Sequence, residues 1–100
     1  MFKIDKTDEY EKWLEGLRDQ VAKSKVLARI RRLQLGNPGD HKGLGGGLSE
    51  LRIPHGKGIR VYYAKYGERV YLLIGGGDKS TQSRDIEAAR KLLAKAREEQ

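Results

Sequence analysis

The sequence contains no cysteine, so it can form neither a disulfide nor a thiolate metal site. No apolar run approaches the ~18 residues that a membrane span needs, and the first residues lack the apolar core of a secretion signal. We therefore expect a cytoplasmic protein that is neither exported nor inserted into a membrane. The sequence also has no histidine pair or dense carboxylate set with metal-ligand spacing, so we expect no metal or other cofactor.

The sequence has fewer acidic than basic residues. The chain has 100 residues, with 21 Lys and Arg against 14 Asp and Glu, which gives a net charge of +7. The basic residues are spread along the chain rather than gathered in a tail. Such an excess attracts polyanions, and RNA, DNA, an acidic protein and an anionic surface are all compatible with it. The length suits one domain, residues 1–100, with a modest core.

The first third of the chain predicts a short strand and a helical hairpin. The strand covers residues 2–4, and Thr7 is a plausible N-cap for the first helix. The apolar residues of that helix recur at helical spacing: Tyr10, Trp13, Leu14, Leu17 and Val21. After a break near residues 19 and 20, a second helix is predicted over about 21–35, with Arg29, Arg31 and Arg32 facing water and Ala22, Val26, Ile30 and Leu33 facing inward.

The second half predicts three consecutive strands and a closing helix. Alternating polar and apolar residues mark strands within 48–53, 59–64 and 70–74, which form an antiparallel meander with the opening strand at an edge. Residues 36–47 are half glycine, so we expect a flexible connector there. Ser83 is the expected N-cap of the last helix. The predicted fold is α+β, with about four strands in the order β-α-α-β-β-β-α.

One side of the predicted sheet gathers charged and aromatic residues: Glu50, Arg52, Arg60 and Tyr62. Guanidinium groups pair with phosphate oxygens and tyrosine rings stack on bases, so this side is typical of a nucleic-acid-binding surface. The third strand leads into Lys79 and Gln82 through three glycines, which indicate the close approach of another segment. The alternative is that the arginines are surface charges paired with Glu50 and Glu68, and that Tyr62 only packs across strands.

These segments together resemble the RelE/ParE superfamily of type II toxins. The resemblance rests on the sequence Ser-Glu-Leu-Arg-Ile at 49–53, Gly-Ile-Arg-Val-Tyr-Tyr at 58–63 and Gly-Gly-Asp-Lys-Ser-Thr-Gln at 76–82, followed by a closing helix. More narrowly, the chain is similar over about residues 2–94 to the phage-derived, HigB-like branch of addiction-module killer proteins. The resemblance implies a compact antiparallel sheet flanked by helices, and cleavage of messenger RNA in the ribosomal decoding site by many members.

The resemblance also implies roles for individual residues. Arg52, Arg60 and Lys79 match the basic positions of RelE-like nucleases and are the expected catalytic residues. Two departures leave the proton carriers open: Glu50 stands at the position of an additional strand lysine, and nothing aromatic follows Tyr71. The further candidates for RNA binding or proton transfer are Lys57, His55, Tyr62, Lys42 and Gln82.

The function implied is that of a toxin which cleaves messenger RNA on the ribosome without a metal ion. Its implied partners are ribosome-bound messenger RNA and a helix-turn-helix antitoxin of the HigA kind. Two alternatives stay open. ParE relatives share the architecture but block DNA gyrase through a protein contact, and a catalytically inactive relative would bind only RNA or an antitoxin.

Overall fold

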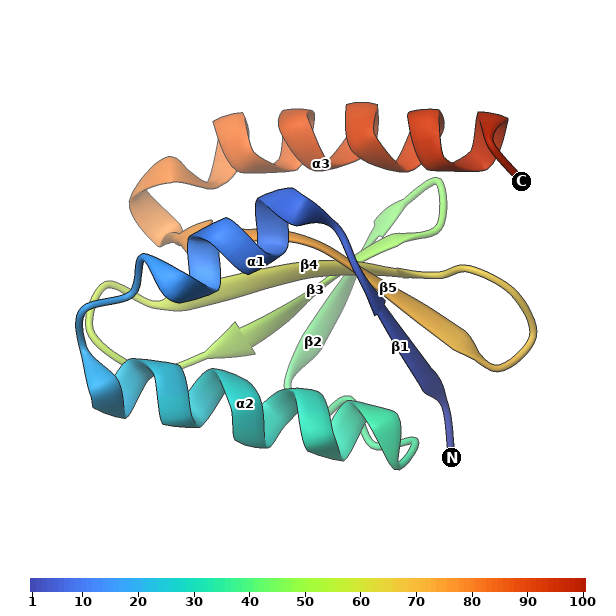
Figure 1. The fold of residues 1–100 in the computed structure, drawn as a ribbon. Coiled ribbons are helices and arrows are strands. Elements are labelled where there is room, and N and C mark those ends of the chain that lie inside the picture. The colour runs from blue at the N-terminus through green and yellow to red at the C-terminus, as the bar shows by residue number, and fades with distance from the viewer.

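The computed structural model describes residues 1–100 and shows a five-stranded sheet flanked by three α-helices (Figure 1). In chain order the elements are β1 (Lys3–Lys6), α1 (Asp8–Glu15), α2 (Gln20–Gln34), β2 (His41–Gly45), β3 (Leu48–Ile53), β4 (Ile59–Lys65), β5 (Val70–Asp78), a 3₁₀ turn η1 (Lys79–Thr81) and α3 (Gln82–Glu98). The strand order is β1-β5-β4-β3-β2, and only the β1–β5 pair is parallel. The predicted α+β fold is confirmed. None of the helices is long and apolar enough to span a membrane.

Polar caps set where the helices begin. The Thr7 hydroxyl accepts the amide hydrogen of Tyr10 at 3.0 Å and donates to the carbonyl of Ile74 at 2.6 Å, so it starts α1 and ties it to β5. Asp19 caps α2 by accepting from the amides of Val21 and Ala22. The expected place of Val21 on the first helix is wrong, because α1 ends at Glu15 and Val21 lies 55% exposed on α2.

The prediction for the start of the last helix is also wrong. Ser83 lies inside α3, which has no side-chain cap of its own. Asp78 instead caps the preceding turn η1 by accepting the amide hydrogen of Ser80 at 2.8 Å. The chain therefore leaves β5 through a tight turn and enters α3 directly.

Residues 36–47 are not a flexible connector. His41–Gly45 forms β2, an edge strand that pairs antiparallel with β3 and places Lys42 opposite Glu50. The amide of Arg52 extends the pairing by donating to the carbonyl of Asp40 at 2.9 Å. The alternation of side chains that marks other strands is missing here because two of the five residues in β2 are glycine.

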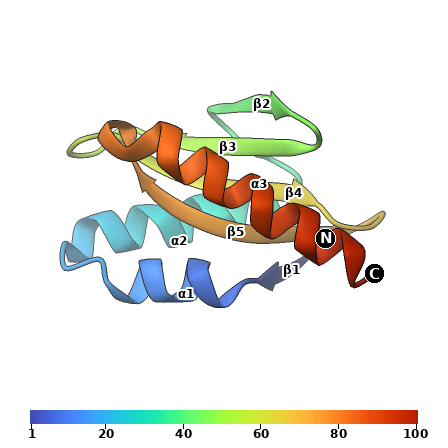
Figure 2. The same cartoon turned by 90° about the horizontal axis from the view of Figure 1, so that it is seen from above.

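Each face of the sheet is covered by different helices. Helices α1 and α2 pack on one face over a core that includes Val26, Leu33, Leu51, Val61 and Leu73. Helix α3 runs across the other face (Figure 2), where it packs on the second core cluster, Leu48, Tyr62, Ala64, Leu72, Ile74, Ala89 and Leu93. The two faces of β3 and β4 are therefore both buried along most of their length, and only the part that α3 does not cover is open.

The middle glycine of the run 75–77 is required by packing. The indole of Trp13 lies so close to Gly76 that a Cβ at this position would overlap the ring. Around Gly75, by contrast, a Cβ would meet nothing within 4 Å, and neither glycine has a positive φ. The close approach expected from the triple glycine is confirmed at Gly76.

We expect Gly76→Ala to lower the free energy of unfolding by about 1–3 kcal/mol, because the added methyl group displaces the Trp13 ring. Gly75→Ala is the matched control in the same strand and should be neutral or slightly stabilising. Urea denaturation of both variants measures the difference. Equal stability of the two would contradict the packing role of Gly76.

Candidate active site

A polar cavity of about 400 Å³ opens on the α3 side of the sheet, beside the turn between β3 and β4. We call it the cationic cavity; its lining residues are Asp40, Arg52, Pro54, Gly56, Lys57, Gly58, Arg60 and Lys79. The structure thus brings together all three residues expected to be catalytic, Arg52, Arg60 and Lys79, and adds Lys57. They come from β3, β4, the turn between them and η1.

Backbone pairing fixes the positions of these cations. Arg52 and Arg60 lie directly opposite each other in the β3–β4 register. Lys79 is held against the turn because its amide donates to the carbonyl of Gly58 at 2.9 Å. Gly58 has a positive φ of 83°, and a Cβ there would lie 3.3 Å from a terminal nitrogen of Arg60. A glycine at this position therefore allows both the turn and the close approach of Arg60 and Lys79.

A buried carboxylate lies at the base of the cationic cavity. The side chain of Glu50 is 0% exposed, whereas those of Arg52 and Arg60 are 36% and 12% exposed. Its Oε2 accepts from Nε of Arg52 at 2.8 Å and lies 3.5 Å from Nε of Arg60. Its Oε1 accepts from the side-chain Nε2 of Gln82 at 2.9 Å. Glu50 was expected on the open side of the sheet, and that expectation is wrong because the start of α3 covers it.

The cationic cavity keeps an excess of positive charge. Arg52, Arg60, Lys57 and Lys79 stand against two carboxylates, Asp40 in the lining and Glu50 beneath it. The bond to Glu50 uses only Nε of Arg52, which leaves its terminal amino groups for a ligand. That bond also raises the pKa of Arg52. The arrangement suits an anion with several oxygens, such as phosphate.

Arg29 organises the segment that leads into the cavity. Its guanidinium donates to the carbonyls of Arg52 at 2.6 Å, Asp40 at 2.7 Å and Pro38 at 2.8 Å. The side chain was expected to face water but is buried, and this burial, followed by the charge of Arg32, lowers its pKa. By holding the chain at residues 38–40, Arg29 places Asp40 at the cavity wall. Sequence reasoning missed Asp40, which reads only as a turn residue.

Tyr62 does not belong to an open surface. It is fully buried beneath α3, so the expectation that it stacks on RNA bases is wrong and the alternative of packing between strands is confirmed. Burial, with a smaller contribution from the nearby Glu50, raises the pKa of its phenol. Alternation along β4 correctly places Tyr62 on the face of Arg60, but it does not reveal how far α3 extends over that face.

The remaining predicted residues lie outside the cationic cavity. Gln82 binds the buried Glu50 instead of facing the opening. Lys42 is exposed on the edge strand β2, opposite Glu50 in register. His55 is turned toward the helical hairpin, where its Nε2 lies 2.7 Å from Oδ2 of Asp19. That hydrogen bond, followed by one from the amide of Ala22, lowers the pKa of Asp19. No three His, Asp or Glu side chains are arranged as a metal site.

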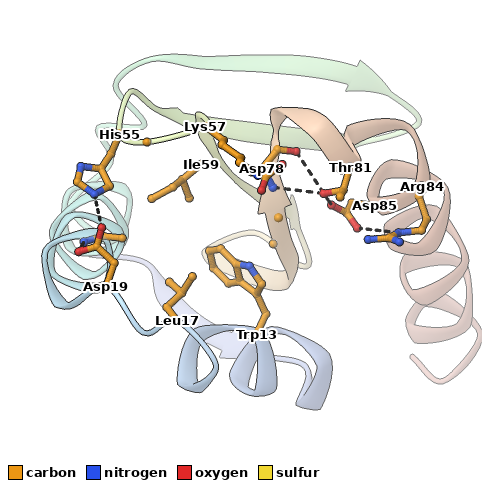
Figure 3. Close-up of a pocket in the computed structure, with 14 residues that line it drawn as sticks. Trp13, Leu17, Asp19, His55, Lys57, Ile59, Asp78, Thr81, Arg84 and Asp85 are labelled. Atoms are coloured by element: carbon orange, nitrogen blue, oxygen red, sulfur yellow. Dashed lines mark hydrogen bonds and ion pairs between the residues drawn. The ribbon is translucent and has the colours of Figure 1, made fainter.

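His55 lines a second cavity of about 380 Å³ on the opposite side of the turn (Figure 3). We call it the tryptophan cavity, and define it by Trp13, Leu17, Ala22 and Ile59 on its apolar side and by Asp19, His55, Lys57, Asp78, Thr81, Arg84 and Asp85 on its polar side. Gly56, Gly76 and Gly77 complete it. Figure 3 shows Trp13, Leu17 and Ile59 directed toward its centre.

Comparison with known proteins places the chain in a family. A model of phage-derived Gp49-like proteins matches residues 12–99. The chain belongs to the phage-derived Gp49-like family. An uncharacterized protein of Haemophilus influenzae is 48% identical to it over 91 residues, which is 91% of each chain. The expected phage-derived family is confirmed.

Two solved toxin structures share the fold of this Gp49-like chain. An Escherichia coli RelE mutant in the free state has a TM-score of 0.66 at 17% identity and covers 90% of this chain and 96% of its own. A copper-bound mutant toxin from Helicobacter pylori has a TM-score of 0.57 at 20% identity and covers 80% and 97%. At these identities the likeness concerns the fold alone.

For this Gp49-like protein we expect Glu50→Gln to lower the free energy of unfolding by about 1–3 kcal/mol, because the two arginines then face each other without a shared anion. Added salt should restore part of the loss by screening that repulsion. Urea denaturation at low and high salt measures both effects. Glu68→Gln, in the exposed turn after β4, is the control and should behave as wild type; equal curves for both variants would contradict the role of Glu50.

The pKa of Asp19 predicts a pH dependence of stability. Because hydrogen bonds lower the pKa of its folded-state carboxyl below the ordinary 3.8, the stabilisation is present above that value and is lost as the pH falls through the lower folded value. We expect wild-type stability to fall more steeply than that of Asp19→Asn between about pH 5 and pH 2. Urea denaturation across this range is the measurement, with Glu68→Gln as control. If the free energies of unfolding of wild type and Asp19→Asn fall in parallel as the pH decreases, this prediction is wrong.

Proposed function

We propose that this protein is the toxin of a type II toxin–antitoxin system and that it cleaves messenger RNA on the ribosome, in the cytoplasm. The family and the RelE-type fold support a toxin. The proposal of nuclease activity rests on one observation. Four cations converge on one cavity: Arg52, Arg60, Lys57 and Lys79. Single-stranded RNA offers a phosphate of the size and charge that such a cavity accepts.

The proposed reaction uses the RNA's own 2′-hydroxyl as the nucleophile. The 2′-oxygen bonds to the adjacent phosphorus while the bond from phosphorus to the 5′-oxygen breaks, which gives a 2′,3′-cyclic phosphate and a 5′-hydroxyl. Negative charge builds up on the non-bridging oxygens as this happens. Arg52 and Arg60 both line the cationic cavity, so a phosphate bound there has two guanidinium groups beside its non-bridging oxygens, and these stabilise the charge.

Two protons have to move in this reaction. Asp40 is the carboxylate in the lining of the cationic cavity, and we assign it the proton of the attacking 2′-hydroxyl. Lys57 or Lys79 then donates a proton to the departing 5′-oxygen. His55 is less suited to either step because its ring is engaged with Asp19 on the other side of the turn. No step of this scheme calls for a metal ion.

A toxin requires a protein that restrains it. We infer a cognate helix-turn-helix antitoxin of the HigA kind, together with ribosome-bound messenger RNA as the substrate. Both follow from the family rather than from any surface described above.

We expect Arg60→Ala to slow messenger RNA cleavage by about a hundred- to a thousand-fold, because it removes a charge that acts on the transition state. Lys42→Ala, which removes an exposed cation outside the cavity, should retain cleavage and lower the slope of log affinity against log salt by about 0.7. Cleavage of messenger RNA on purified ribosomes measures the rates, and circular dichroism checks folding. A folded Arg60→Ala variant with full activity would refute the assignment of the cationic cavity as the active site.

The mapping of transcript ends after brief induction in cells separates the proposed function from its rivals. Discrete cuts in coding regions, absent with Arg60→Ala, support the nuclease. Signatures of DNA damage without such cuts indicate inhibition of gyrase. If folded protein is produced and neither transcript cuts nor DNA damage appear, the protein is a relative that only binds RNA or an antitoxin.

A further inference from the structure

Contacts among its own lining residues fix the walls of the tryptophan cavity. Trp13 is fixed against Gly76, Asp19 binds His55 at 2.7 Å, and the hydroxyl of Thr81 donates to Asp85. Its walls come from both helices of the hairpin, from the β3–β4 turn, and from the end of β5 with the start of α3. With about 380 Å³ it lies in the size range of small-molecule sites.

The two cavities share one boundary, the turn between β3 and β4. Gly56 and Lys57 line both of them. On the other side of the boundary, η1 places Lys79 in the cationic cavity and Thr81 in the tryptophan cavity. A ligand that lies across the turn therefore reaches both cavities at once.

The charges of the two cavities suit different parts of a nucleotide. The tryptophan cavity is lined by three carboxylates, those of Asp19, Asp78 and Asp85, against two cations, Lys57 and Arg84, whereas cations outnumber carboxylates in the cationic cavity, which therefore suits a phosphate better. Its apolar side, with Trp13 and Ile59, suits a flat neutral ring. The carboxylate of Asp78 accepts from Ser80 and from the backbone amide of Thr81, and its remaining lone pairs can accept from an amino group of a base.

We propose that the tryptophan cavity binds a nucleobase of the RNA next to the phosphate held in the cationic cavity. This inference rests on the proposed function and adds a base-binding site to it. Because the free acceptors are carboxylate oxygens, bases with an exocyclic amino group bind better than uracil. Trp13 and Leu17 contact the ring, and Asp78 accepts its amino hydrogens.

Trp13 makes a direct test possible because it is the only tryptophan and gives a single indole N–H signal in NMR spectra of nitrogen-labelled protein. We expect guanosine and cytidine 5′-monophosphate to shift this signal saturably, with dissociation constants around ~1 mM. Uridine 5′-monophosphate should shift it less, and ribose 5-phosphate should not. If no nucleotide moves the signal, or if ribose 5-phosphate moves it equally, the proposal is wrong.

Matched variants show whether the base occupies the cavity. Leu17→Phe, which fills the cavity from a partly exposed position, should weaken nucleotide binding about tenfold. Asp78→Asn keeps a capping side chain and should remove the advantage of amino-bearing bases. Leu27→Phe, on the exposed side of α2, is the control and should bind as wild type. If Leu17→Phe and Leu27→Phe bind equally, the cavity is not the site.

A short RNA with 2′-O-methyl groups, which cannot be cleaved, separates this inference from the proposed function. Simultaneous shifts of the Trp13 indole and of the Gly58 amide support a base and a phosphate bound on either side of the turn. A shift at Gly58 alone overturns the base site but leaves the nuclease proposal intact. If base binding holds while the wild-type protein cleaves no messenger RNA on purified ribosomes, the nuclease assignment fails and the base site stands.

Discussion

Two arginines on neighbouring strands share one buried carboxylate, that of Glu50, and this interaction sets the geometry of the cationic cavity. Like charges placed opposite each other in a sheet repel, so Arg52 and Arg60 need an anion between them to hold this register. Gln82 at the start of α3 satisfies the other carboxylate oxygen. The same contact therefore joins β3, β4 and the first residue of α3, and it leaves the terminal amino groups of Arg52 unused.

Much of the fold follows from the sequence because most elements carry a clear period. The stripe from Tyr10 to Leu14 identifies helix α1 and its buried side, and the alternation from Ile59 to Ala64 identifies strand β4, although both of its faces are buried. Strand β2 lacks that signal, since glycine has no side chain to alternate. Beside its pairing with β3, the buried Arg29 donates to the carbonyls of Arg52 and Asp40, and no pattern of residues reveals these contacts to the backbone.

The candidate site was predictable in part for the same reason. Register follows from alternation, so the grouping of Arg52 and Arg60 on one face could be predicted from β3 and β4 alone. The burial of each residue on that face could not be predicted, because it depends on where α3 crosses the sheet. Glu50 and Tyr62 share the face of the two arginines but lie under the helix, and Asp40 joins the site only because of the fold around it.

The parallel pairing of β1 with β5 has a consequence for biosynthesis. The hydroxyl of Thr7 donates to the carbonyl of Ile74, 67 residues further on, and Lys3 pairs with Val70. Strand β1 therefore cannot pair until β5 has been synthesised. The cationic cavity likewise needs residues from Asp40 to Lys79. A growing chain still attached to its ribosome thus lacks a complete site until Lys79 has emerged.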